Sequence, residues 1–283
     1  MIKTDQSTLA KEPEQQLKVI GQGEAILLLH SSLSSHKQWL PLTVLLSERY
    51  SLWLPDLQGY GQNNPVAFSQ NPVWSLADEA DALLARLTQE QKNTPLTLIG
   101  HSFGGALALH LARTGKLKVK ALLLFEPVAF HLLAAEPDAQ AVASTAEVRL
   151  LSEQMPNLDA EAAAQLFVDY WQQADYFRHL PARMQQQMAG QVWKVPQDFS
   201  ALINEPATTA DYAALQIPVL LLVGSESRQS ALRVSQLLAT SWPQAQITKL
   251  PTGHMGPVTA SELVNQHIVA FLAGLPHKAE PGS

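Results

Sequence analysis

Short apolar runs alternate with longer segments of helical spacing along most of this chain. Runs with the length and composition of strands lie at 25–30, 51–56, 96–102, 120–127, 218–224 and 247–254. Several are apolar at consecutive positions, which is typical of strands covered on both faces. Between them, helical spacing is found at 38–50, 75–90 and 103–115. This alternation predicts an α/β fold with a mostly parallel central sheet flanked by helices.

The alternation stops between about residues 128 and 212. This stretch is rich in Ala, Gln and Glu, has helical patches at 146–155 and 158–173, and shows no strand pattern. The apolar run that follows restores the strand pattern. We therefore expect a core formed by residues 17–127 and 213–275, with a helical cap at 128–212. Such a cap would lie over the carboxyl ends of the strands, where open α/β sheets bind ligands.

Composition removes several classes of function. The 283 residues carry a formal net charge of −6, which gives no broad electrostatic footprint for nucleic acid or an anionic membrane. The absence of cysteine excludes disulfides, thiolate catalysis and Cys-ligated zinc. The apolar runs are too short to span a bilayer, and residues 1–16 lack the apolar core of a signal peptide. We therefore expect a cytoplasmic protein.

One motif points to specific chemistry. Residues 100–104 read Gly-His-Ser-Phe-Gly, a G-x-S-x-G that follows an apolar strand segment and precedes a helical one. In a strand–turn–helix setting the serine occupies a strained turn, and the glycines leave room where side chains would clash. The serine oxygen then lies at a helix N-terminus, whose dipole favours developing negative charge. The motif predicts that Ser102 is a nucleophile.

Three further segments accompany the motif in a consistent order. They are the stretch from His30 to Trp39, PDLQGYG at 55–61 and LPTGHMGP at 250–257. With them the chain resembles the α/β-hydrolase superfamily from about residue 17 to residue 275. The resemblance implies the α/β-hydrolase fold and a serine nucleophile that needs no cofactor and no metal. It also implies that His254, which follows the strand segment ITKL, is the general base.

The acid of the expected triad is not at its usual place. Members of the superfamily most often carry an aspartate in the turn after the strand at 218–224, but that turn reads GSES at 224–227. Glu226 lies one residue early. Glu126 ends another strand segment, a position that several branches use for the acid. A carboxylate in an apolar segment is costly unless it has a partner, which favours Glu126. Glu226, or a site without a functional acid, stays open.

The oxyanion hole needs two backbone N–H donors. The resemblance implies that one comes from Phe103, directly after the nucleophile. The other comes from the loop after the first core strand, where related chains usually have His-Gly-x. Here the loop reads His30-Ser31-Ser32, which places Ser32 at the donor position. Serine in place of glycine at 31 departs from the family pattern.

The expected pocket is mostly apolar. Trp171 from the cap and Leu33, Phe125 and Met255 from the core are the candidate lining residues. A serine nucleophile favours a small-molecule carboxylic ester or related acyl substrate. Two alternatives remain: a cofactor-free dioxygenase on the same scaffold, in which the serine only orients the substrate, and a hydrolase-like small-molecule receptor. No oligomeric state follows from the sequence.

Overall fold

Seven strands form a single sheet. The computed structural model describes residues 17–63 and 74–276. The strand order is β1-β3-β2-β4-β5-β6-β7, with β1 antiparallel to β3 and all other neighbours parallel. The strands are β1 (Lys18–Ile20), β2 (Glu24–Leu29), β3 (Tyr50–Leu54), β4 (Leu96–His101), β5 (Val119–Phe125), β6 (Val219–Gly224) and β7 (Gln246–Leu250). The predicted α/β fold with a mostly parallel sheet is confirmed.

Helices fill the connections between the strands. The core helices are α1 (Leu40–Leu46), α2 (Leu76–Ala85), α3 (Gln89–Asn93), α4 (Phe103–Thr114), α11 (Gln229–Ser241), α12 (Gly256–Thr259) and α13 (Ser261–Ala273), with the 3₁₀ helix η1 (His36–Trp39). Between β5 and β6 lie α5 (His131–Ala134), α6 (Ala139–Gln154), η2 (Met155–Asn157), α7 (Ala160–Trp171), η3 (Phe177–His179), α8 (Ala182–Gln191), η4 (Val192–Lys194), α9 (Val195–Ile203) and α10 (Thr209–Ala213).

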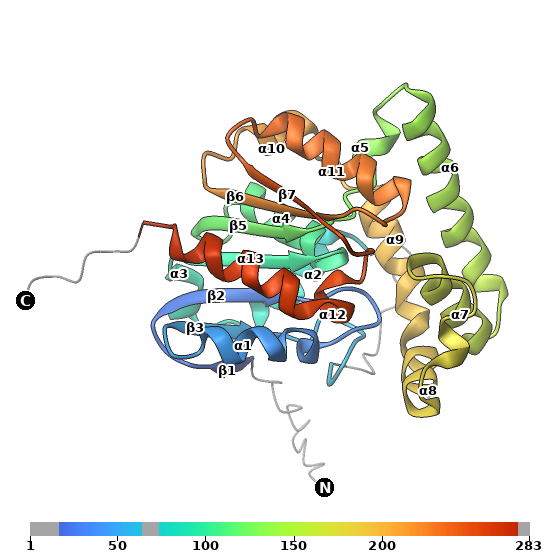
Figure 1. Cartoon of the computed structure of the whole chain (residues 1–283), viewed down its shortest axis with the longest axis horizontal. Coiled ribbons are helices and arrows are strands. Elements are labelled where there is room, and N and C mark those ends of the chain that lie inside the picture. Colours follow the sequence, from blue (N-terminus) through green and yellow to red (C-terminus); the bar gives the residue numbers. More distant parts are fainter. Residues whose placement is uncertain (1–16, 64–73, 277–283) are drawn as a thin grey trace, which may run out of the picture.

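Side chains along the central strands alternate between two hydrophobic clusters. On β2, Leu27 and Leu29 belong to the cluster shared with α2, α4 and α11, whereas Ile26 and Leu28 belong to the cluster shared with α1 and α13. Figure 1 shows α1 and α13 in front of the sheet and α2 and α4 behind it. Because both faces are covered, the strands need apolar residues at every position, and this produces the consecutive runs in the sequence.

The observed strands follow the predicted ones to within two residues at each end, apart from two larger differences. Strand β7 ends at Leu250, and residues 251–254, which were included in the last predicted strand, form a turn. The short strand β1 was not predicted from the sequence. It contributes only Lys18–Ile20 at the edge of the sheet, with two exposed residues, so it carries neither the length nor the apolar content of a buried strand.

All regular secondary structure between β5 and β6 is helical. Asp138 and Asp159 start α6 and α7, since their carboxylates accept hydrogen bonds from the backbone N–H groups of Ala141 (3.0 Å) and Ala162 (2.8 Å). In Figure 1, α6 to α9 lie together at one end of the sheet. The division into core and cap remains a prediction.

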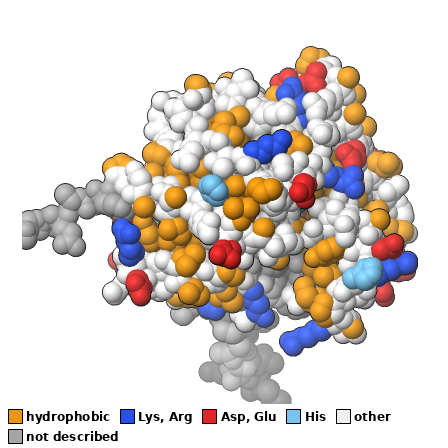
Figure 2. All heavy atoms as spheres, viewed as in Figure 1, with side chains coloured by type: hydrophobic (Ala, Val, Ile, Leu, Met, Phe, Trp, Pro, Cys, Tyr) orange, Lys and Arg blue, Asp and Glu red, His pale blue; other side chains and the backbone are white. Residues whose placement is uncertain are grey.

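The surface seen in Figure 2 is mixed. Hydrophobic side chains are scattered among acidic and basic ones over this face, and Lys and Arg are not gathered in one place. Val44 and Leu45 of α1 and Val258 of α12 are among the exposed hydrophobic residues of the molecule. Over residues 17–63 and 74–276, helices with the length and apolar character needed to cross a bilayer are absent.

Candidate active site

Ser102 lies in the turn between β4 and α4. Its backbone has φ 55° and ψ −120°, which L-residues rarely adopt. The chain passes so close to itself here that a Cβ at Gly104 would lie 2.4 Å from the carbonyl oxygen of Leu29. A Cβ at Gly100 would lie 2.5 Å from the carbonyl oxygen of Gly104. The two glycines are therefore required for the turn that presents Ser102.

Backbone strain is concentrated around this serine. Of the described residues, four non-glycine residues have positive φ, and three of them are Leu33 (54°), Ser102 (55°) and Glu126 (42°). Such conformations cost on the order of 1–3 kcal/mol each and persist only where the surroundings hold them in place. Residues with strained backbone conformations are frequent at functional sites, so these three φ angles favour a functional site at this end of the sheet.

The register of the sheet brings Glu126 beside Ser102. His101, the last residue of β4, pairs with Phe125, the last residue of β5. The backbone N–H of Ser102 donates to the Phe125 carbonyl oxygen at 3.1 Å. Ser102 follows His101 and Glu126 follows Phe125, so Ser102 and Glu126 are neighbours at the ends of the two strands. His254 reaches the same place from the turn after β7.

A continuous series of hydrogen bonds joins the three side chains. His254 Nδ1 lies 2.7 Å from Glu126 Oε2, and His254 Nε2 lies 2.9 Å from Ser102 Oγ. A carboxylate only accepts, so its partner Nδ1 carries the proton in the neutral ring, and this leaves Nε2 as an acceptor for the serine hydroxyl. All three residues are buried. The geometry is that of a serine aligned with a base and an orienting carboxylate.

Only one of the two candidate acids meets the histidine. Glu126 is fully buried, and its second oxygen accepts from the Gly224 backbone N–H at 2.6 Å. Both carboxylate oxygens therefore have donors, and the cost of burying this group is offset. Glu226 is exposed, and its backbone N–H is bonded to the carbonyl oxygen of Thr252. The structure brings Glu126, and not Glu226, to His254.

Two aromatic neighbours enclose His254. The ring of Trp171, at the end of α7, stacks on it with centroids 3.8 Å apart and an interplanar angle of 25°. His101 donates from Nε2 to the His254 carbonyl oxygen at 2.8 Å. Burial, together with the proximity of His254, holds the pKa of His101 well below its usual range. His101 is thus a neutral group that fixes the backbone of the histidine turn.

The serine-rich loop after β2 is held by side chains on both sides. His30 donates from Nδ1 to the Ser31 carbonyl oxygen (2.8 Å) and accepts at Nε2 from the Leu57 backbone N–H (2.9 Å). Burial lowers the pKa of His30 to about 4, so the ring is neutral and can accept. Ser31 donates from both N and Oγ to Gln38 Oε1, at 3.2 and 3.0 Å. The serine at 31 thus adds an anchor that a glycine would lack.

The two residues expected to supply oxyanion donors are placed differently. Phe103 is the first residue of α4, so its backbone N–H has no acceptor within the helix. Ser32 lines a small cavity of about 10 Å³ together with Ser102. The Ser32 hydroxyl donates to Asp198 Oδ2 at 2.5 Å. Only the backbone N–H of Ser32 is left as a donor toward a substrate oxygen.

A larger cavity of about 400 Å³ opens next to the small one. Ser32, Phe167 and Trp171 line both cavities. Half of the remaining lining residues of the larger cavity are aliphatic or Met, namely Leu33, Val168, Leu180, Met184, Met188, Met255 and Val258. The others are Ser34, Ser35, Lys37, Gln38, Gln172, Tyr176 and Gln187. Among the candidate pocket residues, Leu33, Trp171 and Met255 therefore border this space.

Phe125 does not line either cavity. Strand alternation places its side chain in the cluster with α1 and α13, on the opposite face of the sheet from Leu124. There its ring meets His101 edge-on, with centroids 5.5 Å apart. Phe125 thus packs beneath the histidine turn. The sequence interpretation placed it in the pocket because it lies at the end of a strand, without considering which face of the sheet its side chain occupies.

The sequence interpretation missed a buried ion network beside the site. Lys194 bonds to Asp198 and also to Glu79 Oε2 at 3.2 Å. Tyr60 donates to the same Asp198 oxygen as Ser32, at 2.5 Å. The exposed fractions of Lys194, Asp198 and Glu79 are 0%, 1% and 1%. The i, i+4 spacing of Lys194 and Asp198 was visible in the sequence, but this spacing is more typical of solvent-exposed helix faces.

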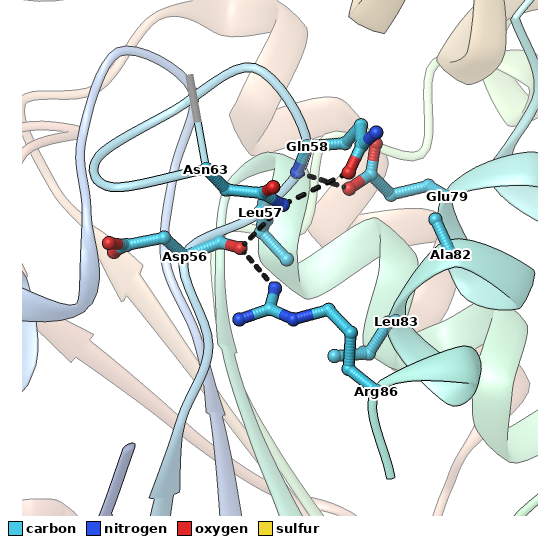
Figure 3. A pocket seen from close by; sticks show the side chains of 8 residues that line it. All are labelled: Asp56, Leu57, Gln58, Asn63, Glu79, Ala82, Leu83 and Arg86. Carbon is cyan, nitrogen blue, oxygen red and sulfur yellow. Dashed lines mark hydrogen bonds between the residues drawn. The ribbon is translucent and has the colours of Figure 1, made fainter. Parts of the chain in front are cut away.

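The loop after β3 connects this network to α2. In Figure 3, Arg86 Nη1 and Asn63 Nδ2 donate to the Asp56 carbonyl oxygen at 2.7 and 3.2 Å, and the Gln58 backbone N–H donates to Glu79 Oε1 at 2.8 Å. The Asp56 carboxylate points away and accepts from the His36 backbone N–H at 2.6 Å. These contacts fix the loop against the core.

Within the described part of the chain, groups of three or more His, Asp or Glu side chains suited to holding a metal ion are absent. What the site offers is a hydroxyl, an imidazole and a carboxylate joined by hydrogen bonds, beside a helix N-terminus. These are the parts used for nucleophilic acyl transfer.

The family model for the alpha/beta hydrolase family matches residues 26–266. The chain belongs to this family. The magnesium-chelatase 30 kDa subunit of Rhodobacter capsulatus is 37% identical over 90 residues, covering 32% of this chain and 30% of that protein. Lipase LipV of Mycobacterium tuberculosis is 34% identical over 102 residues, covering 36% of each. The chain thus matches about a third of the length of these relatives.

Solved structures share the architecture of this alpha/beta hydrolase over nearly the whole chain. MenH from S. aureus superposes with a TM-score of 0.71 at 20% identity, covering 92% of this chain and 98% of its own. At this level of identity the likeness shows the fold.

Proposed function

We propose that the protein is a serine hydrolase that cleaves small-molecule carboxylic esters or related acyl substrates through an acyl-serine intermediate. The observation that carries the proposal is the hydrogen-bond series from Ser102 Oγ through both nitrogens of His254 to Glu126. It supplies a nucleophile, a base in the correct tautomer and a carboxylate that stabilises the imidazolium. Family membership and the family's esterase-like and lipase-like members support the same chemistry.

In the first half of the reaction, Ser102 Oγ attacks the ester carbonyl carbon while His254 Nε2 takes the hydroxyl proton. The carbonyl π electrons move to the oxygen, which becomes the oxyanion held by the N–H groups of Ser32 and Phe103. When the intermediate collapses, the bond to the alkoxy group breaks and His254 returns its proton to the leaving alcohol. The acyl group stays on Ser102.

Water completes the cycle by the same steps. His254 takes a proton from water, the resulting hydroxide attacks the acyl carbon, and the bond to Ser102 Oγ breaks as the proton returns to that oxygen. Glu126 remains ionised throughout and stabilises the transient imidazolium through Nδ1. The products are a carboxylic acid and an alcohol, so water is the only co-reactant.

The substrate is proposed to occupy the 400 Å³ cavity. Its lining includes Leu33, Trp171 and Met255, which favours an apolar acyl or alkoxy group. Trp171 also lines the small cavity that contains Ser102. Residues 128–212 are proposed to act as the cap, since Phe167 and Trp171 of α7 form one wall of this cavity.

The test is hydrolysis of p-nitrophenyl esters of graded chain length, combined with labelling of Ser102 by a fluorophosphonate. We expect turnover that rises with chain length until the cavity is filled, and covalent labelling that the Ser102→Ala variant abolishes. Folded wild-type protein that neither hydrolyses any of the esters nor reacts with the fluorophosphonate would refute the acyl-serine mechanism. That outcome would favour the receptor or the cofactor-free dioxygenase.

A further inference from the structure

The buried ion network contacts both residues assigned as oxyanion donors. We propose that Asp198 and Lys194 are positioning residues, which orient Ser32 and Phe103 so that their backbone N–H groups meet the substrate oxygen. The inference rests on the proposed function, because it assigns a role in the same reaction. Asp198 and Lys194 do not touch the reacting atoms and act through the two donors.

Asp198 is bonded to the hydroxyl of Ser32. Asp198 Oδ2 accepts from Ser32 Oγ and from the Tyr60 hydroxyl, both at 2.5 Å, while Oδ1 is bonded to Lys194. Asp198 borders the small cavity beside Ser102, but both of its carboxylate oxygens are already bonded within the protein. Its contact with Ser32 holds the loop. Leu33 follows with φ 54°, so the Ser32 peptide is oriented in a strained turn that needs such a contact.

Lys194 lies against the side chain of Phe103. Lys194 Nζ lies 4.9 Å from the centroid of the Phe103 ring, within cation–π range, and Phe103 is fully buried. The Lys194 stem also packs on the loop after β3, where a Cβ at Gly59 would come within 2.9 Å of Lys194 Cγ. Gly59 has φ 81°, which suits a glycine at this close approach. The ring of Phe103, the first residue of α4, therefore packs against a buried cation.

The charges of the network explain why it can hold this position. Burial lowers the pKa of Lys194, but attraction to Asp198 and Glu79 outweighs it, and the net pKa is raised. Lys194 is therefore an ammonium group between two carboxylates at neutral pH. Such a buried ion group has one favourable arrangement, because displacing any member leaves a desolvated charge without a partner.

The network also joins the two parts of the chain. Lys194 and Asp198 belong to the segment between β5 and β6, whereas Ser32, Phe103 and Glu79 belong to the remainder. Any shift of α9 changes the bond to Ser32 directly. The oxyanion loop is thus set by the proposed cap, and not only by the sheet below it.

The experiment compares Ser32→Ala, Asp198→Asn and the double variant with wild-type protein. Ser32→Ala removes the hydroxyl but keeps the backbone N–H, so a change in rate reports on positioning. We measure kcat and KM on a p-nitrophenyl ester, the rate of Ser102 labelling by a fluorophosphonate, and the thermal unfolding midpoint. Each single variant should lower kcat and the labelling rate on the order of 10-fold with KM nearly unchanged. The double variant should lose no more than the worse single one.

Ser230→Ala is the matched control. Ser230 of α11 is also buried, and its hydroxyl bonds to the Tyr170 hydroxyl of α7 at 3.0 Å, away from the oxyanion loop. This variant should keep wild-type kcat even if its unfolding midpoint falls. Wild-type rates in Ser32→Ala, or losses in the single variants that simply multiply in the double variant, would overturn the inference alone. Wild-type protein that does not react at Ser102 would overturn it together with the proposed function.

Discussion

The strand-end site and the buried ion network lie side by side but are built in different ways. Ser102, Glu126 and His254 follow β4, β5 and β7, and strand register with strained backbone angles sets their places. Lys194 and Asp198 reach their places through side chains that cross from one part of the chain to the other. One arrangement is fixed by the main chain, and the other by pairing of buried charges.

The difference implies different consequences of mutation. At the strand-end site, strand register sets the position of Ser102, so Ser102→Ala should remove activity with little loss of stability. In the ion network, each side chain neutralises its neighbours, so a substitution leaves an unpaired buried charge and should destabilise the fold. The predictions below test this separation.

The largest expected effect is on activity at the strand-end site. Ser102→Ala and His254→Ala should each lower kcat on the order of 10³-fold or more, because they remove the nucleophile or its base. The double variant should lose little beyond either single one, since the two residues act as a unit. Ester turnover and thermal unfolding of the same preparations are the measurements. A large fall in the unfolding midpoint with Ser102→Ala would contradict the proposed separation.

Glu126→Gln should cause a comparable loss of kcat, on the order of 10³-fold, because the amide cannot stabilise the imidazolium as an anion does. Glu226→Gln is the matched control on the exposed turn and should be nearly silent. Both variants are assayed on the same ester over a range of pH. The reverse ranking would reassign the acid to Glu226.

Removing the cation of the ion network should lower stability. Lys194→Met leaves Asp198 and Glu79 buried without their cation, so the free energy of unfolding should fall by about 3–5 kcal/mol in urea denaturation. Lys116→Met is the control, because Lys116 pairs with Asp81 at the surface, where the exposed side chains make the pair worth at most about 1 kcal/mol. Equal losses in the two variants would show that the network does not stabilise the fold.

Acid should weaken the fold through histidines outside both sites. Burial lowers the pKa of His131, as of His30, to about 4. Between about pH 6.5 and pH 4 the unfolded chain binds a proton at each ring and the folded chain does not, so stability falls as pH falls. Each ring contributes about 3 kcal/mol of this loss by pH 4.

Replacing one of these rings separates its contribution. His131→Gln should lower the free energy of unfolding at pH 7, because the hydrogen bond between the ring and Tyr212 is lost. Between pH 6.5 and pH 4 the free energy of unfolding should fall less steeply with pH, because unfolding then takes up about one proton fewer. Urea denaturation at several pH values measures this slope. An unchanged slope of stability against pH would show that protonation of His131 is not coupled to unfolding.

The sequence predicted the fold where local pattern and tertiary environment agree. Consecutive apolar runs gave the central strands because both faces of the sheet are covered, and the G-x-S-x-G turn lies at a strand–helix junction as expected. It did not predict β1, whose pairing with β3 is a tertiary contact without a local pattern. It also did not predict that Phe125 turns away from the cavity, because one step along a strand reverses the face.

The candidate site likewise has residues that the sequence predicted and contacts that only the tertiary structure decided. Sequence alone determined that Ser102 stands on a glycine-flanked turn and that His254 follows the last strand, since both depend on local chain geometry. It narrowed the acid to two carboxylates, and the register of β5 against β6 then brought Glu126 to His254 and left Glu226 exposed. The bond between Ser32 and Asp198 spans 166 residues and was decided only by tertiary structure. Pairing of buried polar groups that are distant in sequence leaves no periodic pattern in the sequence. The reason is that a charge without a partner becomes costly only when folding removes it from water.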